Sequence, residues 1–221
     1  KGVKMMVEEG RAMPMKVYAT MPSCVPAAPG FEDAGAIFGP QEVAEAMQDD
    51  RIIGLGEMMN FPGVIYGDQN THGELKATLD AGKPITGHYS IPDLEVGLQA
   101  YAAAGVASCH ESTTKDDALA RMRLGMYAKL REGSAWHDVK ETVRAITENN
   151  IDTRYAILVT DDVHPHTLME LGHLDHVVRQ AIRQGVNPIT AIQMVTINTA
   201  QCFRVDRHLG SISPGRCADI V

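Results

Sequence analysis

The sequence has 221 residues, 44% of them hydrophobic and 22% charged, which is the ordinary composition of a soluble globular protein. Its net charge of −8 argues against a nucleic-acid-binding surface, and no apolar run approaches the ~18 residues of a membrane span. The four cysteines (Cys24, Cys109, Cys202 and Cys217) lie far apart without a Cys-x-x-Cys pair, so we expect free thiols in the cytoplasm and no cysteine-based zinc site.

The first half of the chain alternates apolar, β-rich runs with amphipathic segments. The chain starts at Lys1 inside a segment with helix character. Pro40 stands where helices prefer proline, and Thr71 and Gly82 are placed to begin and end a helix. The pattern predicts a strand and its loop over residues 16–26, further strands over 51–60 and 84–90, and helices over 40–48, 71–82 and 92–105.

The second half continues the same alternation. The pattern predicts strands over residues 106–113, 126–132 and 154–162, and helices over 115–125, 137–149, 167–185 and 188–204. The sequence stops at 218-ADIV-221, an apolar run with strand character. Because both ends fall in mid-element, we interpret the sequence as a piece of a longer protein.

Repeated β-then-α order predicts an α/β fold with a parallel sheet covered by helices. A doubly wound sheet and a TIM barrel both fit that order. Four polar residues favour the barrel, because Glu57, His88, His110 and Asp161 each come at the carboxyl end of a predicted strand. In a barrel these ends surround one mouth, where active sites form.

Taken singly, each of these four residues is more simply explained as a loop carboxylate or a hydrogen-bonded histidine. Together they place carboxylate and imidazole groups at four strand ends, and Zn, Mn and Fe(II) accept such ligands. Their joint occurrence therefore favours a metal site. His164 and His166 have the spacing of a ligand pair, but they lie in a loop beyond the strand, where His164 could instead contact a substrate.

The succession of Glu, His, His and Asp at strand ends resembles the amidohydrolase superfamily of metal-dependent TIM-barrel hydrolases. The last residues, 210-GSISPGRCADIV-221, resemble that superfamily's return from the barrel to a small β-sandwich. More narrowly, six segments resemble the bacterial adenine deaminase family: 21-MPSCVPAAPGFEDAGA-36, 54-GLGEMMNFPGVI-65, 87-GHYS-90, 109-CHEST-113, 160-TDDVHP-165 and 172-GHLDHVVRQAI-182.

The resemblance implies that residues 1–206 form strands three to eight of an incomplete (β/α)8 barrel and that residues 207–221 start the β-sandwich. Segment 16–26 then corresponds to strand three. Strands one and two, with the His-x-His metal ligands that the superfamily carries on strand one, have no counterpart in this sequence. We therefore expect the chain by itself to bind metal poorly, and we expect the full-length protein to be the enzyme.

The resemblance also implies a binuclear divalent metal site. Glu57 takes the position of the bridging acid, where many members of the superfamily have a modified lysine. His88 and His110 take the histidine positions on strands five and six, and Asp161 takes the strand-eight position. The ligand types suit Mn or Fe best and also allow Zn.

For the reaction, the resemblance implies hydrolytic deamination of adenine, with Asp161 accepting a proton from water. Asp162 is expected to face away from Asp161, because neighbouring strand residues alternate, and to orient the substrate or a ligand. Glu111 either carries a proton to the purine ring or only orients a ligand. His164 and Ser112 are expected to contact the substrate.

The expected partners are a small purine base and a second copy of the chain in a homodimer. A cyclic amide hydrolase of the same superfamily, such as a dihydroorotase or a hydantoinase, is the nearest alternative. Glu57 in place of the usual lysine and the segment 160-TDDVHP-165 count against it. A non-catalytic metal- or purine-binding remnant of the barrel is the alternative outside the enzymes.

Overall fold

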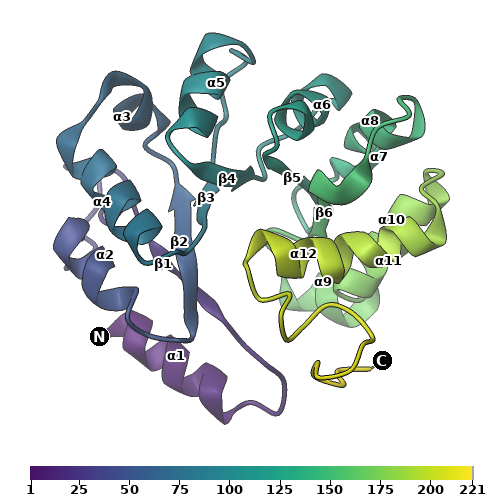
Figure 1. Ribbon diagram of the computed structural model, residues 1–221, viewed down its shortest axis with the longest axis horizontal. Coiled ribbons are helices and arrows are strands. Elements are labelled where there is room, and N and C mark those ends of the chain that lie inside the picture. Colours follow the sequence, from purple (N-terminus) through teal and green to yellow (C-terminus); the bar gives the residue numbers. More distant parts are fainter. Residues whose placement is uncertain (221) are drawn as a thin grey trace. The chain divides into compact units, whose positions relative to one another are not determined.

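The computed structural model describes residues 1–220, and Figure 1 shows how its elements are arranged. Six strands occur in this part of the chain, and their order in the sheet follows their order in the sequence. The strands pair in parallel. They are β1 (Ala19–Pro22), β2 (Ile52–Met58), β3 (Ile85–Gly87), β4 (Val106–Cys109), β5 (Tyr127–Arg131) and β6 (Ala156–Val159).

Helices connect successive strands, which confirms the predicted α/β architecture. Within residues 1–220, none of these helices has the length and apolar character that a membrane crossing requires. They are α1 (Gly2–Ala12), α2 (Pro40–Ala46), α3 (Phe61–Tyr66), α4 (Gln69–Asp80), α5 (Val96–Ala103), α6 (Lys115–Arg123), α7 (Val139–Thr142), α8 (Arg144–Thr147), α9 (Pro165–Glu170), α10 (Leu174–Arg183), α11 (Pro188–Val195) and α12 (Ile197–Cys202), with a 3-10 turn η1 (Thr153–Tyr155) before β6.

The chain divides into two compact units. Unit 1 comprises residues 1–89 and 95–107, and unit 2 comprises residues 90–94 and the chain from residue 108 onward. The predicted change from barrel to β-sandwich near residue 206 stays a prediction. Residues 218–220 form no strand, and the last residue of the predicted apolar run, Val221, lies outside the described residues.

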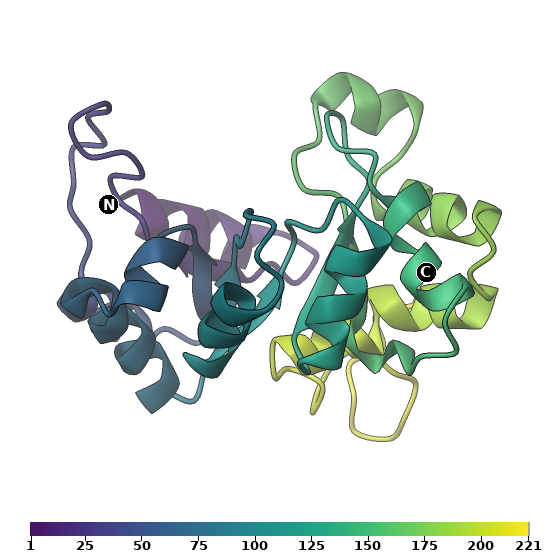
Figure 2. The ribbon, with the colours of Figure 1, turned by 90° about the horizontal axis from the view of Figure 1, so that it is seen from above.

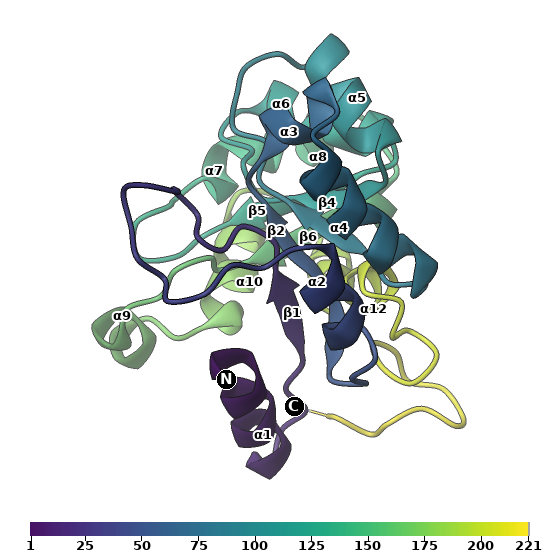
Figure 3. The same ribbon diagram turned by 90° about the vertical axis from the view of Figure 1, so that its left-hand side faces the viewer.

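Unit 1 contains β1 to β3 with helices α1 to α5. Its core includes Leu55 of β2, Ile85 of β3 and Val43 of α2, all fully buried. Helix α2 lies beside α4 in both Figure 1 and Figure 3. Gly56 allows β1 and β2 to approach, because a Cβ atom at this position would lie 2.3 Å from Thr20 Oγ1.

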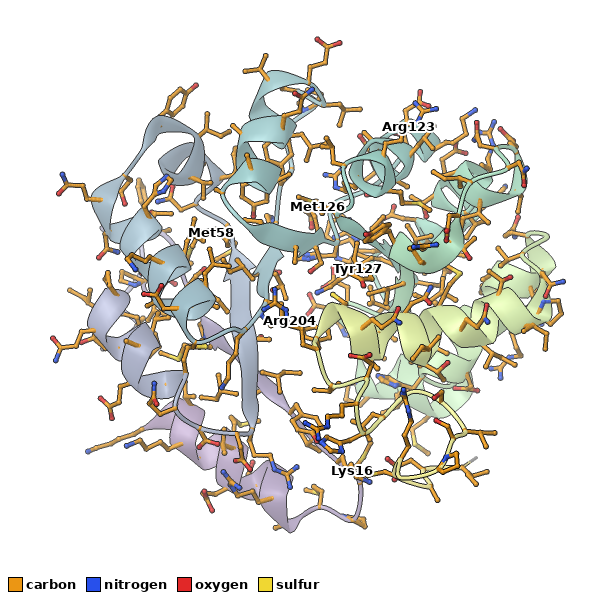
Figure 4. All side chains as sticks on the ribbon, viewed as in Figure 1. Lys16, Met58, Arg123, Met126, Tyr127 and Arg204 are labelled. Atoms are coloured by element: carbon orange, nitrogen blue, oxygen red, sulfur yellow. The ribbon has the colours of Figure 1, made fainter. Side chains whose placement is uncertain are left out.

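Unit 2 contains β5 and β6 with helices α6 to α12. A buried cluster joins these strands to the five helices α6, α7, α8, α10 and α11, through Leu119, Leu130, Val139, Ala145, Leu158, Val177 and Met194 among others. Arg123 lies on the exposed side of α6, whereas Met126, which follows that helix, is buried (Figure 4). Leu119 and Met122 of α6 are buried in the same cluster as Leu130 of β5, so α6 covers β5 with an apolar face.

The start of the helix predicted over 71–82 was wrong, because α4 is capped by Asp68 and not by Thr71. The Asp68 carboxylate accepts hydrogen bonds from the Thr71 backbone N at 2.8 Å and from its hydroxyl at 2.7 Å. Gly82 follows the helix with φ 71°, as expected for a glycine that ends a helix. Helix α3 was not predicted, and Asn60 caps it by accepting from the Gly63 backbone N.

The three long helices predicted in the second half are each broken in two. Gly172, with φ 102°, separates α9 from α10, and Thr196 lies outside helical geometry between α11 and α12. Helices α7 and α8 meet at Val143. Both halves bury side chains at the breaks at Val143 and Thr196, whereas α9 buries none. Periodicity alone does not show these interruptions.

Candidate active site

Two of the predicted ligands lie together in unit 1. Glu57 is the residue before the last in β2, and His88 follows β3 directly. Their side chains approach to 3.4 Å between His88 Nδ1 and Glu57 Oε1, and both are partly exposed. The structure therefore places both residues at carboxyl strand ends, as the sequence predicts.

Tyr101 of α5 joins the ends of β2 and β3, and this residue was not predicted from the sequence. Its buried hydroxyl donates to the carbonyl oxygen of Met58 at 2.6 Å and accepts from the backbone N of His88 at 3.1 Å. Gly87 allows this contact, because a Cβ atom there would lie 2.6 Å from the hydroxyl. Tyr101 thus fixes the backbone next to both Glu57 and His88.

The other predicted residues gather in unit 2. His110 directly follows β4, and Glu111 lies beside it with Oε1 3.2 Å from His110 Nε2. Asp161 lies two residues beyond β6. His110, Glu111 and Asp161 each offer a ligand atom, and these three atoms lie within 4.8 Å of one another. One imidazole and two carboxylates form a donor set that suits divalent Mn, Fe or Zn.

Asp161 has a left-handed backbone conformation with φ 58°, which is uncommon for a residue other than glycine. Because β6 ends at Val159, the predicted alternation of neighbouring strand residues does not govern Asp161 and Asp162. The turn after the strand directs the Asp161 side chain instead, and this side chain is 23% exposed. The strand-based argument for the orientation of Asp162 was therefore wrong.

Arg131, the last residue of β5, contacts this cluster and was missed by the sequence analysis. Its Nη1 donates to Glu111 Oε1 at 2.6 Å and to Asp161 Oδ2 at 2.9 Å. Its Nε donates to Asp138 Oδ2 at 3.1 Å, and Nη2 lies 3.0 Å from the same oxygen without hydrogen-bond geometry. The Arg131 side chain is 1% exposed, and its guanidinium carbon lies 4.5 Å from the centre of the Trp136 ring.

Burial opposes the charge of Arg131, but the carboxylates of Glu111, Asp161 and Asp138 outweigh it, so the pKa of the guanidinium is raised above its usual value. An arginine at the end of a short strand resembles a surface residue in the sequence. Only the fold shows that three acidic side chains from separate loops contact it.

The loops after β5 and β6 contact each other closely. Ser134 donates from its backbone N to the carbonyl oxygen of Asp162 at 3.0 Å, and its hydroxyl accepts from the backbone N of His164 at 2.8 Å. The same hydroxyl lies 2.9 Å from Thr167 Oγ1 at the start of α9. Figure 2 shows α9, in light green, beside the loop that follows β5.

The other residues that the sequence singled out are Ser112, His164 and His166. Ser112 is fully buried, and its hydroxyl has no hydrogen-bond partner within residues 1–220. His164 is exposed at the start of α9, and His166 on that helix pairs with Glu170 at 3.2 Å. Neither histidine belongs to a metal-binding group in the part of the chain that the structure describes.

Comparison with known proteins identifies relatives of the whole chain. It is 67% identical over 220 residues to a protein named adenine deaminase from Moorella thermoacetica, and 60% identical over 220 residues to a protein of the same name from Clostridium botulinum. Each match includes 100% of this chain and 37% of the relative. The chain thus spans about a third of the length of the curated relatives it matches.

A solved amidohydrolase structure shares the fold, with a TM-score of 0.58 at 15% identity over 98% of this chain and 64% of that one. This likeness and the parallel β-α order agree with an incomplete barrel of the amidohydrolase type. The model of the amidohydrolase family matches residues 1–221. The chain therefore belongs to the amidohydrolase family.

Proposed function

We propose that the protein containing this chain catalyses the metal-dependent hydrolysis of adenine to hypoxanthine and ammonia. The observation that carries the proposal is the 67% identity, over 220 residues, to a relative named adenine deaminase. Because the chain spans 37% of that relative, the activity is proposed for the protein in which the chain stands. A cytoplasmic location and a homodimer belong to the same proposal.

We assign Glu57, His88, His110 and Asp161 as ligands of a binuclear divalent metal site. Their carboxylate and imidazole groups suit such ions, and Mn or Fe is proposed ahead of Zn. The grouping of His110, Glu111 and Asp161 in unit 2 and the contact of Glu57 with His88 in unit 1 support the assignment. When bound, the ions would lower the pKa of water at the site toward ~7.

The residues of unit 2 have the chemistry that the reaction needs. Water adds its oxygen to C6 of adenine while Asp161 accepts the water proton. Glu111 delivers a proton to the ring nitrogen N1. Asp161 then passes the water proton to the C6 amine, the C6–amine bond breaks and ammonia leaves, and the proton of the new C6 hydroxyl returns to Glu111 as the carbonyl of hypoxanthine forms. Asp162 and His164 are proposed to orient the purine.

A cyclic amide hydrolase of the same family is the second candidate, because it would use the same ligand types. The presence of Glu57 in place of the superfamily's usual bridging lysine favours the deaminase. The third candidate, a metal- or purine-binding protein without catalysis, would bind metal and adenine without releasing ammonia.

A substrate comparison separates the three candidates. The protein encoded by the complete gene is purified with Mn(II) and incubated separately with adenine, dihydroorotate and hydantoin. We expect ammonia release from adenine and no ring opening of the other two compounds. Ring opening of either cyclic amide without adenine turnover would identify the second candidate, and metal binding without any turnover would identify the third.

A further inference from the structure

We propose that Arg131 is a positioning residue, which holds the carboxylates of Asp161 and Glu111 in the orientation that deamination requires. The inference rests on the proposed function, because it gives Arg131 a part in that reaction. It adds a residue of β5 to a site whose other members in unit 2 follow β4 and β6.

A single nitrogen atom of Arg131 connects the two carboxylates. Nη1 lies 2.6 Å from Glu111 Oε1 and 2.9 Å from Asp161 Oδ2. The guanidinium is planar and its donors point in fixed directions, so it determines where both oxygens lie. A bond to Oδ2 of Asp161 also determines the direction in which Oδ1 of the same carboxylate points.

Arg131 is itself held from the opposite side. Asp138 accepts from Nε at 3.1 Å, and the Trp136 ring lies against the guanidinium, with 4.5 Å between the guanidinium carbon and the ring centre. The side chain is 1% exposed, so it has no room to follow a moving carboxylate. These contacts place the guanidinium independently of Glu111 and Asp161, as a positioning residue requires.

The segment after β5 also holds the backbone that carries Asp161. Gly133 lies so close to this backbone that a Cβ atom would be 2.2 Å from the carbonyl oxygen of Thr160. Ser134 donates from its backbone N to the carbonyl oxygen of Asp162 at 3.0 Å. One short segment therefore constrains Asp161 through its side chain and through the peptide groups on both sides.

The test measures kcat and KM for adenine, bound Mn and the melting temperature of the Mn-loaded protein from the complete gene. For Arg131→Met we expect kcat to fall about 100-fold, with KM and Mn content unchanged, because misplaced reacting groups cost about that much. For Arg131→Lys we expect a kcat about tenfold above that of Arg131→Met, since a point charge replaces only part of the fork. A purely structural role would lower the melting temperature without this rescue of kcat.

Arg144→Met is the matched control, because Arg144 also pairs with two carboxylates of unit 2, Glu141 and Glu148, but is more exposed. Its kcat should stay within twofold of the parent. If Arg131→Met does not fold, Asp138→Asn takes its place. This variant weakens the contact that holds the guanidinium of Arg131 and leaves the charge of Arg131 intact. We expect a severalfold lower kcat at unchanged KM.

Three results would overturn the inference: a kcat within threefold of the parent in Arg131→Met, or in Asp138→Asn where that variant replaces it; a kcat of Arg131→Lys no higher than that of Arg131→Met; or loss of bound Mn in Arg131→Met. A parent protein that releases no ammonia from adenine would instead refute the proposed function itself.

Discussion

Asp161 shows how much of the proposed chemistry depends on one residue. Its backbone is left-handed, with φ 58°, at a cost of about 1–2 kcal/mol for a residue with a side chain. Backbone strain of this kind persists where the surrounding structure enforces it and is often found at functional sites. The contacts from Arg131 and the loop after β5 are what enforce it here.

Asp161→Asn should reduce kcat for adenine by roughly 1,000-fold in the Mn-loaded protein, because an amide cannot accept the water proton. General acid–base catalysis accelerates a reaction by about this factor. Asparagine also tolerates the left-handed conformation, so the melting temperature of the metal-free protein should change little. The control is Asp116→Asn on the exposed side of α6, which should retain full activity. Near-normal turnover by Asp161→Asn would remove this residue from the mechanism.

The position of a residue at the carboxyl end of a strand could be predicted when the residue directly follows an apolar strand, as His88 and His110 do. Tyr101 and Arg131 could not be predicted. A tyrosine within a helix and an arginine at a strand end are ordinary in a sequence, and their contacts arise between elements far apart in the chain.

At the scale of elements, α4 has a buried acidic residue with a consequence for stability. Burial raises the pKa of Glu74 to about 7, and the nearby Asn70 amide, which donates to it at 3.1 Å, only partly offsets this. The unfolded chain loses the Glu74 proton near its ordinary pKa of 4.5, before the folded protein does. The contribution of Glu74 is therefore most favourable below pH 4.5 and is lost as the pH rises through 7.

Glu74→Gln should stabilise the protein at pH 8 by on the order of 2–3 kcal/mol and change it little at pH 4.5, because glutamine stays neutral and can keep the bond from Asn70. Urea unfolding followed by circular dichroism at both pH values measures the difference. Glu9→Gln on the exposed side of α1 is the control, with an expected effect below ~0.5 kcal/mol at either pH. An equal effect of Glu74→Gln at both pH values would refute the prediction.

Gly133→Ala tests the contact between the loops after β5 and β6. The new Cβ would lie 2.2 Å from the carbonyl oxygen of Thr160 and 2.6 Å from that of Asp162, so the loops must move apart. We expect a loss of about 1–3 kcal/mol in unfolding free energy and a lower kcat. Gly2→Ala is the control, because its Cβ would have no neighbour within 4 Å. Unchanged stability and kcat in Gly133→Ala would show that the contact is not required.

The order of strands and helices could be predicted because parallel strands buried under helices leave continuous apolar runs. All six predicted strands are present, and each is shorter than predicted. The breaks at Gly172 and Thr196 and the helix α3 were not predicted, because they depend on local backbone geometry that the apolar period does not record.

At the scale of the whole molecule, metal binding should contribute to stability, because ligands from separate strands meet only in the folded protein. Chelation of the protein from the complete gene should lower its melting temperature, and Mn(II) should restore it. At 100 times its dissociation constant, Mn(II) would contribute about 2.7 kcal/mol. A melting temperature that is the same with and without metal would contradict the assignment of Glu57, His88, His110 and Asp161 as metal ligands.

The proposed deaminase activity is tested most directly by following the conversion of adenine to hypoxanthine by ultraviolet absorbance. The assay uses the protein from the complete gene loaded with Mn(II), with ammonia measured in the same samples. We expect equal amounts of hypoxanthine and ammonia, with turnover that disappears on chelation and returns when Mn(II) is added back. A folded, metal-loaded protein that leaves adenine unchanged would contradict the proposed activity.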